Sequence, residues 1–462
     1  MSAGIDTDVI VVGGGISGLA CAWGLQQRGM RVILLEAAPR AGGSIGTVRE
    51  HGCLLESGPN SALDSTPLIG HLLDQLGLAR ERISANAAAR KRFVLRDGAL
   101  TALPLSPLEF VATPLFSPRA KLRLLCEPFI GRGAADGEES VAQFVRRRLG
   151  GEFLDYAINP FVAGVYAGDP EALSVRAAFP RLHELEQAYG SLIGGYILGA
   201  RARARNPDRS KHAAPMFAFR EGMQTLTDGL ARRLARVELA TEVVGVTPGN
   251  GCQLVTACGP HGRRELRAHA VALAVPAYAA VSLVEPFAPA AAAALAAIPY
   301  PPVAVAIGAY RRDAVRHALD GFGVLVPLRE HRNILGTIFS STLFANRAPS
   351  EIALLTTFVG GTRQPELGRL DGNEVAEMVQ AEHVSMLGVR ERAEFVRVTR
   401  WLRAIPQYTL GHAARIAVVA EAERTVPGLF FCANYRGGVA IGDCVKSAHR
   451  AADQIVQFLR GK

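Results

Sequence analysis

The chain has 462 residues, of which 49% are hydrophobic and 20% charged, and it contains 48 glycines. This is an ordinary globular composition on a chain too long for one small core, so two or three domains are expected. The formal net charge of +9 would suit an anionic partner such as nucleic acid, a phospholipid surface or an acidic small molecule. An arginine-rich composition alone would also produce this charge.

The distribution of individual residue types excludes several classes of protein. The seven cysteines are dispersed with no Cys-x-x-Cys pair, which indicates buried thiols in a reducing compartment. The eleven histidines show no metal-ligand spacing, so no metal site is expected. Residues 1–7 lack the basic residues of a signal peptide. The uncharged stretch 270–284 contains Pro276 and predicts a buried strand and a turn, not a membrane-spanning helix.

The first elements form a dinucleotide-binding pattern. The β-branched run 8–12 predicts a parallel strand buried on both faces, and Gly13-x-Gly15-x-x-Gly18 follows it directly. Apolar spacing predicts a helix after the glycines and then a second strand at 31–36. Gly13 permits the tight turn, Gly15 lets a pyrophosphate approach the backbone, and Gly18 lets the helix pack closely on the strand.

The residues after the second strand favour FAD over NAD. Glu36 is placed to accept hydrogen bonds from ribose hydroxyls. In the segment APRAGGSIGT that follows, Arg40, Gly42 and Gly43 are placed to form a second loop across the pyrophosphate. A nicotinamide-binding domain usually continues instead with another strand and helix.

The far end of the chain supports the same cofactor. Residues 429–459 predict a strand, a glycine turn and a long amphipathic helix. The N-terminus of that helix, near 439–441, would point its positive dipole end at an electron-rich flavin edge. The sequence therefore predicts FAD.

Both ends of the chain resemble the flavoprotein superfamily of amine oxidases, phytoene desaturases and protoporphyrinogen oxidases. Interior stretches narrow the resemblance to the protoporphyrinogen IX oxidase family, oxygen-dependent flavoenzymes late in haem and chlorophyll synthesis. In chain order these stretches are LLESGPNSAL (54–63), RFVLRDGALTALP (92–104), EESVAQFVRRRLGGEF (138–153), NPFVAGVYAGDPEALSVRAAFPRLHELEQAYGS (159–191), GFGVLVP (321–327), LGTIFSS (335–341) and AIPQYTLGH (404–412). The resemblance extends over essentially the whole chain.

The resemblance implies non-covalently bound FAD. Ser44 departs from the tryptophan that many relatives have after the two glycines. The residues that match the family's FAD contacts are Gly13, Gly14, Gly15, Ile16, Ser17, Gly18, Glu36, Ala37, Ser44, Gly58, Pro59, Asn60, Val243, Ala433, Val439, Ala440 and Ile441.

The resemblance also implies a substrate pocket for a tetrapyrrole. Arg92 matches the arginine that pairs with a propionate group. Apolar walls would supply affinity by burying a large macrocycle, while one charge-assisted bond, worth roughly 1.5–3 kcal/mol, would fix its orientation. The residues that match the pocket lining are Gly164, Phe322, Gly323, Leu325, Ile338 and Phe358.

The implied reaction oxidises protoporphyrinogen IX to protoporphyrin IX, with a hydride passing to FAD and dioxygen reduced to hydrogen peroxide. Catalysis is then mostly positioning of a C–H bond over the flavin N5 in a dry site. No catalytic side chain is nominated. Tyr408 and His412 are interpreted as structural residues near the flavin.

The expected fold is of the α/β class, with three parts. A Rossmann-type FAD-binding domain is discontinuous and comprises 1–88, 216–276 and 416–462. A mixed α+β substrate domain covers 277–414. A helical insertion, which the family resemblance makes the membrane-associated part, covers 92–200.

The apolar stretch 105–133, with interspersed Arg and Lys, is either core helices with loops or a face that enters an anionic bilayer surface. The basic run 200–211 is interpreted as a solvated loop. We expect a cytoplasmic protein peripherally associated with the inner membrane. Its expected partners are a porphyrinogen, dioxygen and anionic lipid. A neighbouring haem-pathway enzyme and a second copy of the chain are further candidates, and nucleic acid is not.

The sequence alone leaves three alternative functions open. Oxidation of coproporphyrinogen III uses the same chemistry on a substrate with four propionates, which would ask for more cations than Arg92. A flavin amine oxidase usually places a mid-chain lysine beside the flavin, and here no lysine occurs between Lys211 and Lys446. A non-enzymatic flavin-containing assembly factor has no motif that would distinguish it.

Overall fold

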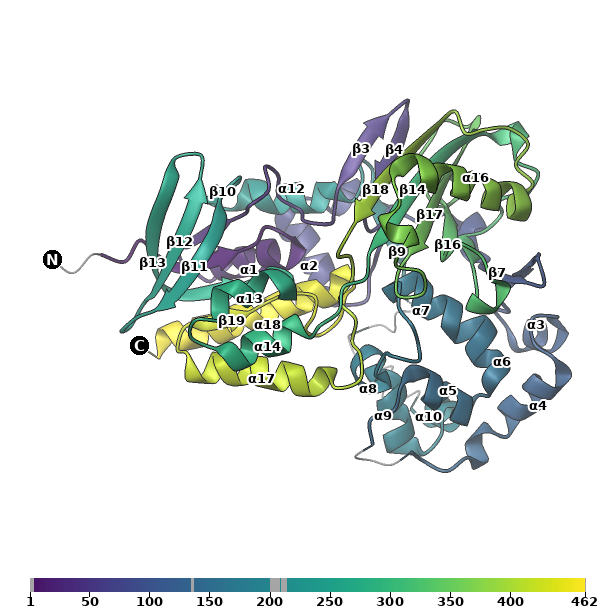
Figure 1. The fold of residues 1–462 in the computed structure, drawn as a ribbon, viewed down its shortest axis with the longest axis horizontal. Helices are drawn as coiled ribbons and strands as arrows, with labels where there is room; N and C mark the ends of the chain where they lie inside the picture. Colours follow the sequence, from purple (N-terminus) through teal and green to yellow (C-terminus); the bar gives the residue numbers. More distant parts are fainter. Residues whose placement is uncertain (1–3, 134–136, 200–207, 209–213, 462) are drawn as a thin grey trace.

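Two seven-stranded sheets organise the protein, and a body of short helices lies below the second sheet in Figure 1. The computed structural model describes residues 4–133, 137–199, 208 and 214–461. The basic run 200–211 therefore lies outside the described residues, apart from Asp208.

The first sheet has the strand order β10-β2-β1-β13-β12-β11, with β19 paired to β13. The contacts among β10, β2, β1, β13 and β19 are parallel, while β13, β12 and β11 form an antiparallel meander. Its strands are β1 (Thr7–Val12), β2 (Val32–Leu35), β10 (Val237–Glu238), β11 (Glu242–Pro248), β12 (Gln253–Gly259), β13 (Gly262–Leu273) and β19 (Leu429–Phe431).

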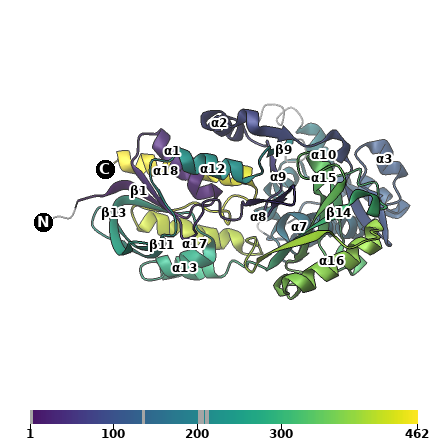
Figure 2. The same ribbon diagram turned by 90° about the horizontal axis from the view of Figure 1, so that it is seen from above.

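Helices cover both faces of the first sheet because β1 is apolar on both sides. Val9 and Val11 pack towards α1 and α18, while Ile10 and Val12 pack towards α13, α14 and α17 (Figure 2). The helices of this lobe are α1 (Ile16–Gln27), α2 (Pro67–Leu76), α12 (Gln224–Arg233), α13 (Ala277–Val284), α14 (Pro289–Ala296), α17 (His412–Thr425) and α18 (Ile441–Arg460).

The second sheet has the order β18-β14-β17-β16-β15-β7-β8. One face packs on α16, whose buried His383 is hydrogen-bonded to Thr357 (2.8 Å) and Tyr310 (2.9 Å). The other face packs on α7 (Asn159–Tyr166). The elements are β7 (Phe93–Arg96), β8 (Ala99–Ala102), β14 (Val303–Arg311), β15 (Gly323–Leu325), β16 (Gly336–Phe339), β17 (Ile352–Gly360), β18 (Phe395–Trp401), α15 (Ser340–Leu343) and α16 (Gly372–Leu387).

Two small sheets connect the lobes. They contain β3 (Thr47–Glu50) paired with β4 (Cys53–Glu56), and β9 (Met216–Phe219) between β5 (Ala62–Leu63) and β6 (Arg82–Ser84). The helical body contains α3 (Pro107–Ala112), α4 (Pro118–Leu125), α5 (Val141–Arg148), α6 (Gly151–Phe153), α7 (Asn159–Tyr166), α8 (Val175–Ala178), α9 (Pro180–Tyr189) and α10 (Leu192–Leu198).

Buried ion pairs hold the short helices of this body together. Arg148, fully buried at the end of α5, pairs with Glu127 (3.1 Å) and Glu186 of α9 (2.5 Å). Glu127 also accepts hydrogen bonds from the hydroxyl of Ser191 (2.6 Å) and the backbone N–H of Leu192 (2.8 Å) at the start of α10. Because each helix is too short to be stable alone, these bonds fix how the helices pack.

The mixed α/β fold is the one predicted, but the domain limits differ from those expected in two places. Residues 93–102 are not part of the helical body: they form β7 and β8, and β7 pairs in parallel with β15 of the second sheet. Residues 277–296 are not part of the second lobe: α13 and α14 bury their alanine-rich faces on the first sheet. Both differences arise from strand pairing and packing between residues far apart in the sequence.

None of the described helices combines the length and the apolar character needed to cross a bilayer. The stretch 270–284 instead forms the end of β13 and helix α13.

Glu186→Gln should destabilise the protein by about 3 kcal/mol, because it removes one of the two carboxylates that pair with the buried charge of Arg148. Burial raises the pKa of Glu186, but hydrogen bonds from Arg147 and Arg148 outweigh it and hold the pKa below the ordinary glutamate value. The carboxylate therefore stabilises the fold above the unfolded-state pKa, and this contribution is lost as the pH falls through the folded-state pKa.

Denaturant unfolding at pH 7 and in mild acid measures this effect. The difference between wild type and Glu186→Gln should be full at pH 7 and should shrink in acid. Glu184→Gln, an exposed residue on the same helix, is the matched control and should change little. A loss for Glu186→Gln no larger than that of the control would contradict the buried network.

Candidate functional site

The turn after β1 leaves the N-terminus of α1 open. Gly13 has a φ of 105°, and a Cβ on Gly18 would lie 1.9 Å from the carbonyl oxygen of Gly13, so both positions require glycine. Gly15 is the N-cap residue, and no side chain caps the helix. A Cβ on Gly15 would meet no atom within 4 Å. Ile16 and Ser17 begin the helix, so free N–H groups face an open space, as an anion site requires.

The second loop lies directly against this turn. Gly42 donates its N–H to the carbonyl of Gly14 (2.8 Å), and a Cβ on Gly43 would lie 3.3 Å from the Cα of Gly15. Arg40, predicted as a cation for the pyrophosphate, donates to the loop carbonyls of Ile45 (2.8 Å) and Gly43 (2.9 Å). Its main contacts therefore shape the loop.

Glu36 directly follows β2. In a dinucleotide-binding unit, an acidic residue at this position binds the ribose hydroxyls. The Glu36 carboxylate accepts from the N–H groups of Gly14 and, at 2.8 Å, Ala38, one residue beyond Ala37. A carboxylate offers about four lone-pair sites, so acceptor capacity remains for ribose hydroxyls. Val243, buried near the start of β11, lies two residues beyond Thr241, which donates its N–H to the Glu36 carbonyl (2.8 Å).

The Gly58-Pro59-Asn60 segment is held against the second loop. A Cβ on Gly58 would lie 2.1 Å from the carbonyl oxygen of Ser44, so this approach also requires glycine. The indole N–H of Trp401, at the end of β18, donates to the carbonyl of Ser57 (2.8 Å). The second lobe is thereby fixed to the nucleotide loops.

A buried ion pair that the sequence analysis did not identify supports the same segment. Glu56 and Arg347 are 3.1 Å apart with side chains 1% and 2% exposed, and burial raises the pKa of Glu56 while it lowers that of Arg347. Glu56 also accepts from the hydroxyl of Thr47 (2.7 Å) and the N–H of Met223 (2.9 Å). The sequence signal that could have indicated this ion pair is the single glutamate at the end of the otherwise apolar strand Cys53–Glu56.

The turn before α18 is fixed by Tyr408 and His412, as predicted for structural residues. The hydroxyl of Tyr408 accepts from the N–H of Gly438 (3.0 Å) and donates to the carbonyl of Asn434. The ring of His412 stacks on that of Tyr408 with centroids 4.2 Å apart. Burial raises the pKa of Tyr408 and lowers that of His412 to about 4, so neither group exchanges protons readily near neutral pH.

This turn brings Ala433, Val439 and Ala440 to the N-terminus of α18, with Ile441 as its first helical residue. α18 lies beside α1 on the same face of the first sheet (Figure 2). The three loops contact one another and α18 begins beside α1, and we call this set of residues, from Glu36 to Val439, the nucleotide cradle. These residues fit an extended dinucleotide with its pyrophosphate at α1 and its flavin ring near α18. In the described part of the chain, no three His, Cys, Asp or Glu side chains come together as a metal site would require.

The second sheet provides an apolar wall next to this cradle. Leu325 pairs with Gly336, which pairs with Phe358, while Ile338 lies two residues beyond Gly336. Because side chains alternate along a strand, Leu325, Ile338 and Phe358 lie on one face, and each is half-buried. Gly336 places no side chain between them, which leaves the wall flat.

Helix α7 forms the opposite wall. A Cβ on Gly164 would lie 2.8 Å from Cδ2 of Leu325, so glycine lets α7 approach the strand this closely. Gly323 approaches β16 closely, since its Cβ would lie 2.2 Å from the carbonyl oxygen of Thr337. This close pairing fixes Phe322 at the edge of the apolar wall.

Arg92 lies at that edge, immediately before β7. Its guanidinium carbon is 5.7 Å from the centroid of the Phe322 ring. No carboxylate among the described residues pairs with it, whereas the neighbouring Lys91 pairs with Asp320. The charge of Arg92 is therefore available to an anionic group.

Arg363 holds the two walls together, and sequence reasoning missed it. It donates to the carbonyl of Val326 after β15 (2.7 Å) and to the carbonyl of Asn159 in α7 (3.0 Å). Burial lowers its pKa to about 10. Its place two residues after Gly361, which follows Gly360 at the end of β17 and like it has a positive φ, is the signal that could have indicated a special turn.

Comparison with known proteins agrees with this geometry. Residues 16–456 match the family of flavin-containing amine oxidoreductases, to which the chain belongs. It is 33% identical to protoporphyrinogen oxidase 2 of Arabidopsis thaliana over 98% of this chain and 94% of that protein. It is 27% identical to coproporphyrinogen III oxidase of Bacillus subtilis over 98% of each chain.

Among solved structures, one from Exiguobacterium sp. 255-15, assigned provisionally as a protoporphyrinogen oxidase, has a TM-score of 0.82 at 24% identity and covers 99% of this chain and 100% of that chain. This similarity shows the fold. Together with the family match, the comparisons confirm three predictions: the resemblance to the protoporphyrinogen oxidase family, the FAD cofactor and the oxidoreductase class.

Gly15→Val should prevent FAD binding while the protein still folds. The φ of Gly15 is −71°, which valine tolerates, and the added side chain would fill the open space in front of α1. We expect at least about a tenfold lower FAD affinity, corresponding to 1.4 kcal/mol. Flavin absorbance of the purified protein and its thermal unfolding measure the two effects separately.

Gly70→Val is the control, because a Cβ at Gly70 on α2 also meets no atom within 4 Å. This variant should retain FAD. Full flavin content in Gly15→Val would show that the pyrophosphate does not lie at α1.

Proposed function

We propose that the protein oxidises protoporphyrinogen IX to protoporphyrin IX in haem biosynthesis. The main observation behind this proposal is an apolar wall of Leu325, Ile338 and Phe358 with a cation, Arg92, at its edge, and no described carboxylate pairs with that cation. A large, mostly apolar macrocycle with acidic arms matches such a surface. The full-length similarity to protoporphyrinogen oxidases supports the same substrate class.

The residues of the chain position the substrate. Bound FAD supplies the hydride acceptor, which the walls cannot provide themselves. Leu325, Ile338 and Phe358 bury one face of the macrocycle and exclude water, and Arg92 orients it through a carboxylate. Arg363 keeps the two walls at a fixed separation. The overall reaction that we propose consumes dioxygen and yields hydrogen peroxide.

Coproporphyrinogen III is the second candidate substrate, because the Bacillus subtilis relative carries that name. Its additional propionates would need further cationic partners in the pocket. Arg363 does not supply one, because it is enclosed between α7 and β15, where its guanidinium donates to the carbonyls of Val326 and Asn159 and burial lowers its pKa. Arg92 is the one cation that the family resemblance places in the pocket, and a single cation suits protoporphyrinogen IX better than coproporphyrinogen III.

Turnover with each substrate tests the proposal. The purified protein is supplied with protoporphyrinogen IX, coproporphyrinogen III and a polyamine, and porphyrin fluorescence and peroxide are followed. We expect protoporphyrinogen IX to give the highest kcat/KM. Porphyrinogen oxidation no faster than in air without protein would exclude the proposed reaction.

Arg92→Ala should raise KM roughly tenfold, the equivalent of one lost charge-assisted hydrogen bond, with FAD content unchanged. Lys91→Ala is the matched control, because Lys91 is the adjacent cation but pairs with Asp320. Steady-state kinetics of the two variants provide the comparison. Equal changes in both would indicate a general charge effect and would remove Arg92 from the site.

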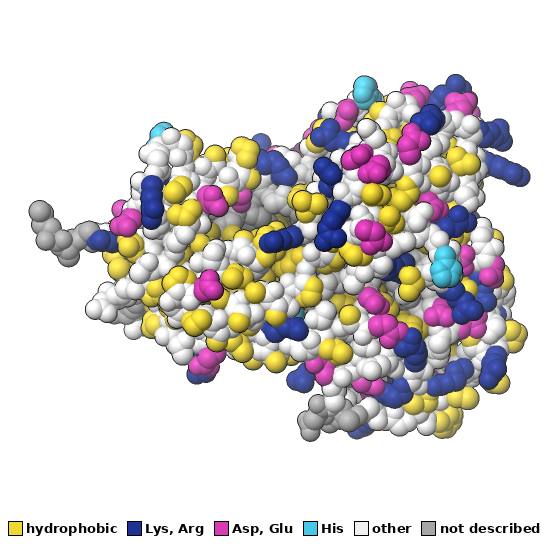
Figure 3. Space-filling model, viewed as in Figure 1, with side chains coloured by type: hydrophobic (Ala, Val, Ile, Leu, Met, Phe, Trp, Pro, Cys, Tyr) yellow, Lys and Arg dark blue, Asp and Glu magenta, His cyan; other side chains and the backbone are white. Residues whose placement is uncertain are grey.

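We also propose that the helical body rests on an anionic membrane, with the protein in the cytoplasm at the inner membrane. Large apolar side chains of α3, α4 and the following turn are exposed, among them Leu108 (84%) and Phe129 (90%). Figure 3 shows hydrophobic and basic side chains side by side along the lower right edge, over these helices. Exposed apolar groups surrounded by cations suit a lipid surface.

The double variant Leu108→Ser with Phe129→Ser should reduce co-sedimentation with anionic vesicles roughly tenfold, because two apolar side chains would no longer enter the lipid. Leu402→Ser, which changes an exposed leucine (61%) beside β18, is the control. Binding that falls equally in control and double variant, or that is absent for wild type at low salt, would argue against this membrane face.

A further inference from the structure

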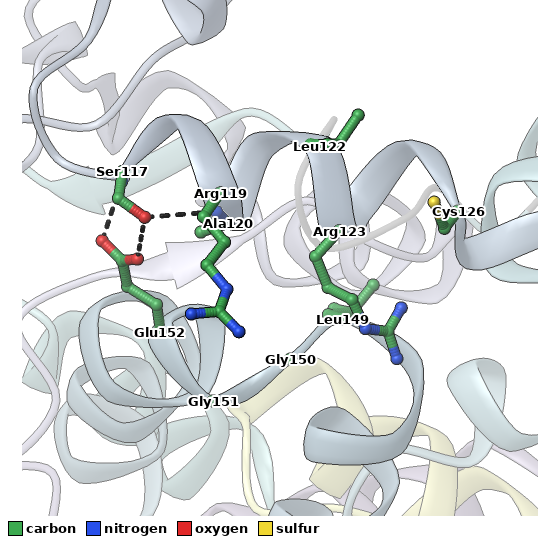
Figure 4. A pocket seen from close by; sticks show the side chains of 10 residues that line it. All are labelled: Ser117, Arg119, Ala120, Leu122, Arg123, Cys126, Leu149, Gly150, Gly151 and Glu152. Carbon is green, nitrogen blue, oxygen red and sulfur yellow. Dashed lines mark hydrogen bonds between the residues drawn. The ribbon is translucent and has the colours of Figure 1, made fainter.

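A pocket of about 420 Å³ opens between α4 and the turn that leads into α6 (Figure 4). It lies in the helical body and is lined by Arg119 and Arg123 of α4, by Leu149, Gly150 and Gly151 of the turn, and by Glu152. Figure 4 shows both arginine side chains extending from α4 towards the turn. None of these residues belongs to the nucleotide cradle or the apolar wall.

Two arginines, Arg119 and Arg123, give the pocket its positive charge. Arg119 has no carboxylate partner among the described residues. Arg123 donates to the carbonyls of Arg147 (2.6 Å) and Arg148 (3.3 Å) at the end of α5, which orient its guanidinium without neutralising it. Two guanidinium groups on successive turns of one helix therefore face the same space.

Glu152 is the one carboxylate of the lining, and its charge is already satisfied. It accepts from Arg96 (2.8 Å) and from both the hydroxyl (2.6 Å) and the N–H (2.8 Å) of Ser117. A ligand with a cationic group would find no free acceptor of opposite charge here. The pocket therefore favours a ligand that is anionic and carries no compensating ammonium group.

The mouth of the pocket continues into exposed apolar surface. Leu122 (63% exposed) lines the pocket, and Leu125 (69% exposed) follows one turn later on α4. Lys121, between the arginines, is held by the carbonyls of Val111 and Thr113 at 2.7 Å each. The ligand should therefore combine an anionic head with an apolar tail.

We propose that this pocket binds the headgroup of an anionic phospholipid, with the phosphodiester between Arg119 and Arg123 and the acyl chains on Leu122 and Leu125. Arginine guanidinium groups match phosphate oxygens in geometry and charge. This inference rests on the proposed membrane contact of the helical body and adds to it a defined site that selects the lipid class. It does not depend on the reaction that the protein catalyses.

Vesicle binding of the full-length holoenzyme tests the site. Co-sedimentation is measured with phosphatidylcholine vesicles and with vesicles that also contain phosphatidylglycerol. Wild type should prefer the second kind by about fivefold or more, since each cation near an anionic surface contributes roughly a factor of five. Arg119→Gln should remove most of this preference, whereas Arg176→Gln, an exposed arginine of α8 in the same body, should not.

Gly151→Phe separates a pocket from a merely basic surface. A Cβ at Gly151 meets no atom within 4 Å, so the aromatic ring can fill the pocket while every cation is kept. The preference for phosphatidylglycerol should fall at least about threefold, somewhat less than the factor of about five from one cation. Unchanged thermal unfolding and FAD content confirm that the variant is folded.

Three outcomes would overturn the inference. The first is equal binding of both vesicle types, which leaves an apolar membrane contact intact but removes the headgroup site. The second is an unchanged lipid preference in both Arg119→Gln and Gly151→Phe. The third is complete competition by inorganic phosphate at the same phosphate concentration as the lipid, which would make the pocket a site for a soluble anion.

Discussion

The close approach of α1 to β1 is the constraint on which the remaining structure depends. Gly18 lies so near the carbonyl of Gly13 that any side chain would collide with it, and this contact fixes where α1 begins. The N-terminus of the helix is then left uncapped in front of an open space. Every other part of the nucleotide cradle is arranged around that position: the second loop touches Gly15, Gly58 touches the second loop, and α18 lies beside α1.

The two lobes work together because a few buried polar groups join them. Trp401 and the Glu56–Arg347 pair hold the nucleotide loops against the second sheet, and Tyr408 holds the turn before α18. Arg363 sets the separation of α7 and β15. Each of these groups would be costly to bury unpaired, so the correct arrangement of the lobes is the one that satisfies them. The apolar wall and the cradle are thus placed side by side by contacts that bind no ligand themselves.

Much of this arrangement could be predicted from the sequence, where local patterns carry the information. The run 8–12, the three glycines and the second strand specify β1, α1 and β2, and the last segment specifies β19 and α18. The position of β7 could not be predicted in the same way, because its partner β15 lies more than 200 residues further along the chain. The alanine-rich sequences of α13 and α14 do not indicate which of the two sheets these helices cover.

The candidate site shows the same division. Family motifs identified glycines and apolar residues that the structure brings together, including Gly164 and Leu325 on facing walls. The bonds from the Arg40 guanidinium to the carbonyls of its own loop could not be predicted, because they depend on how that loop folds. Buried charges such as Arg363 and Arg148 have no local signature, since their partners come from distant elements.

The most direct test of the central claim is anaerobic reduction of the holoenzyme by protoporphyrinogen IX, followed through the flavin absorbance. The proposed function predicts that the flavin is bleached while porphyrin forms, and that dioxygen restores the oxidised spectrum. Flavin that stays oxidised in the presence of excess porphyrinogen would contradict the account.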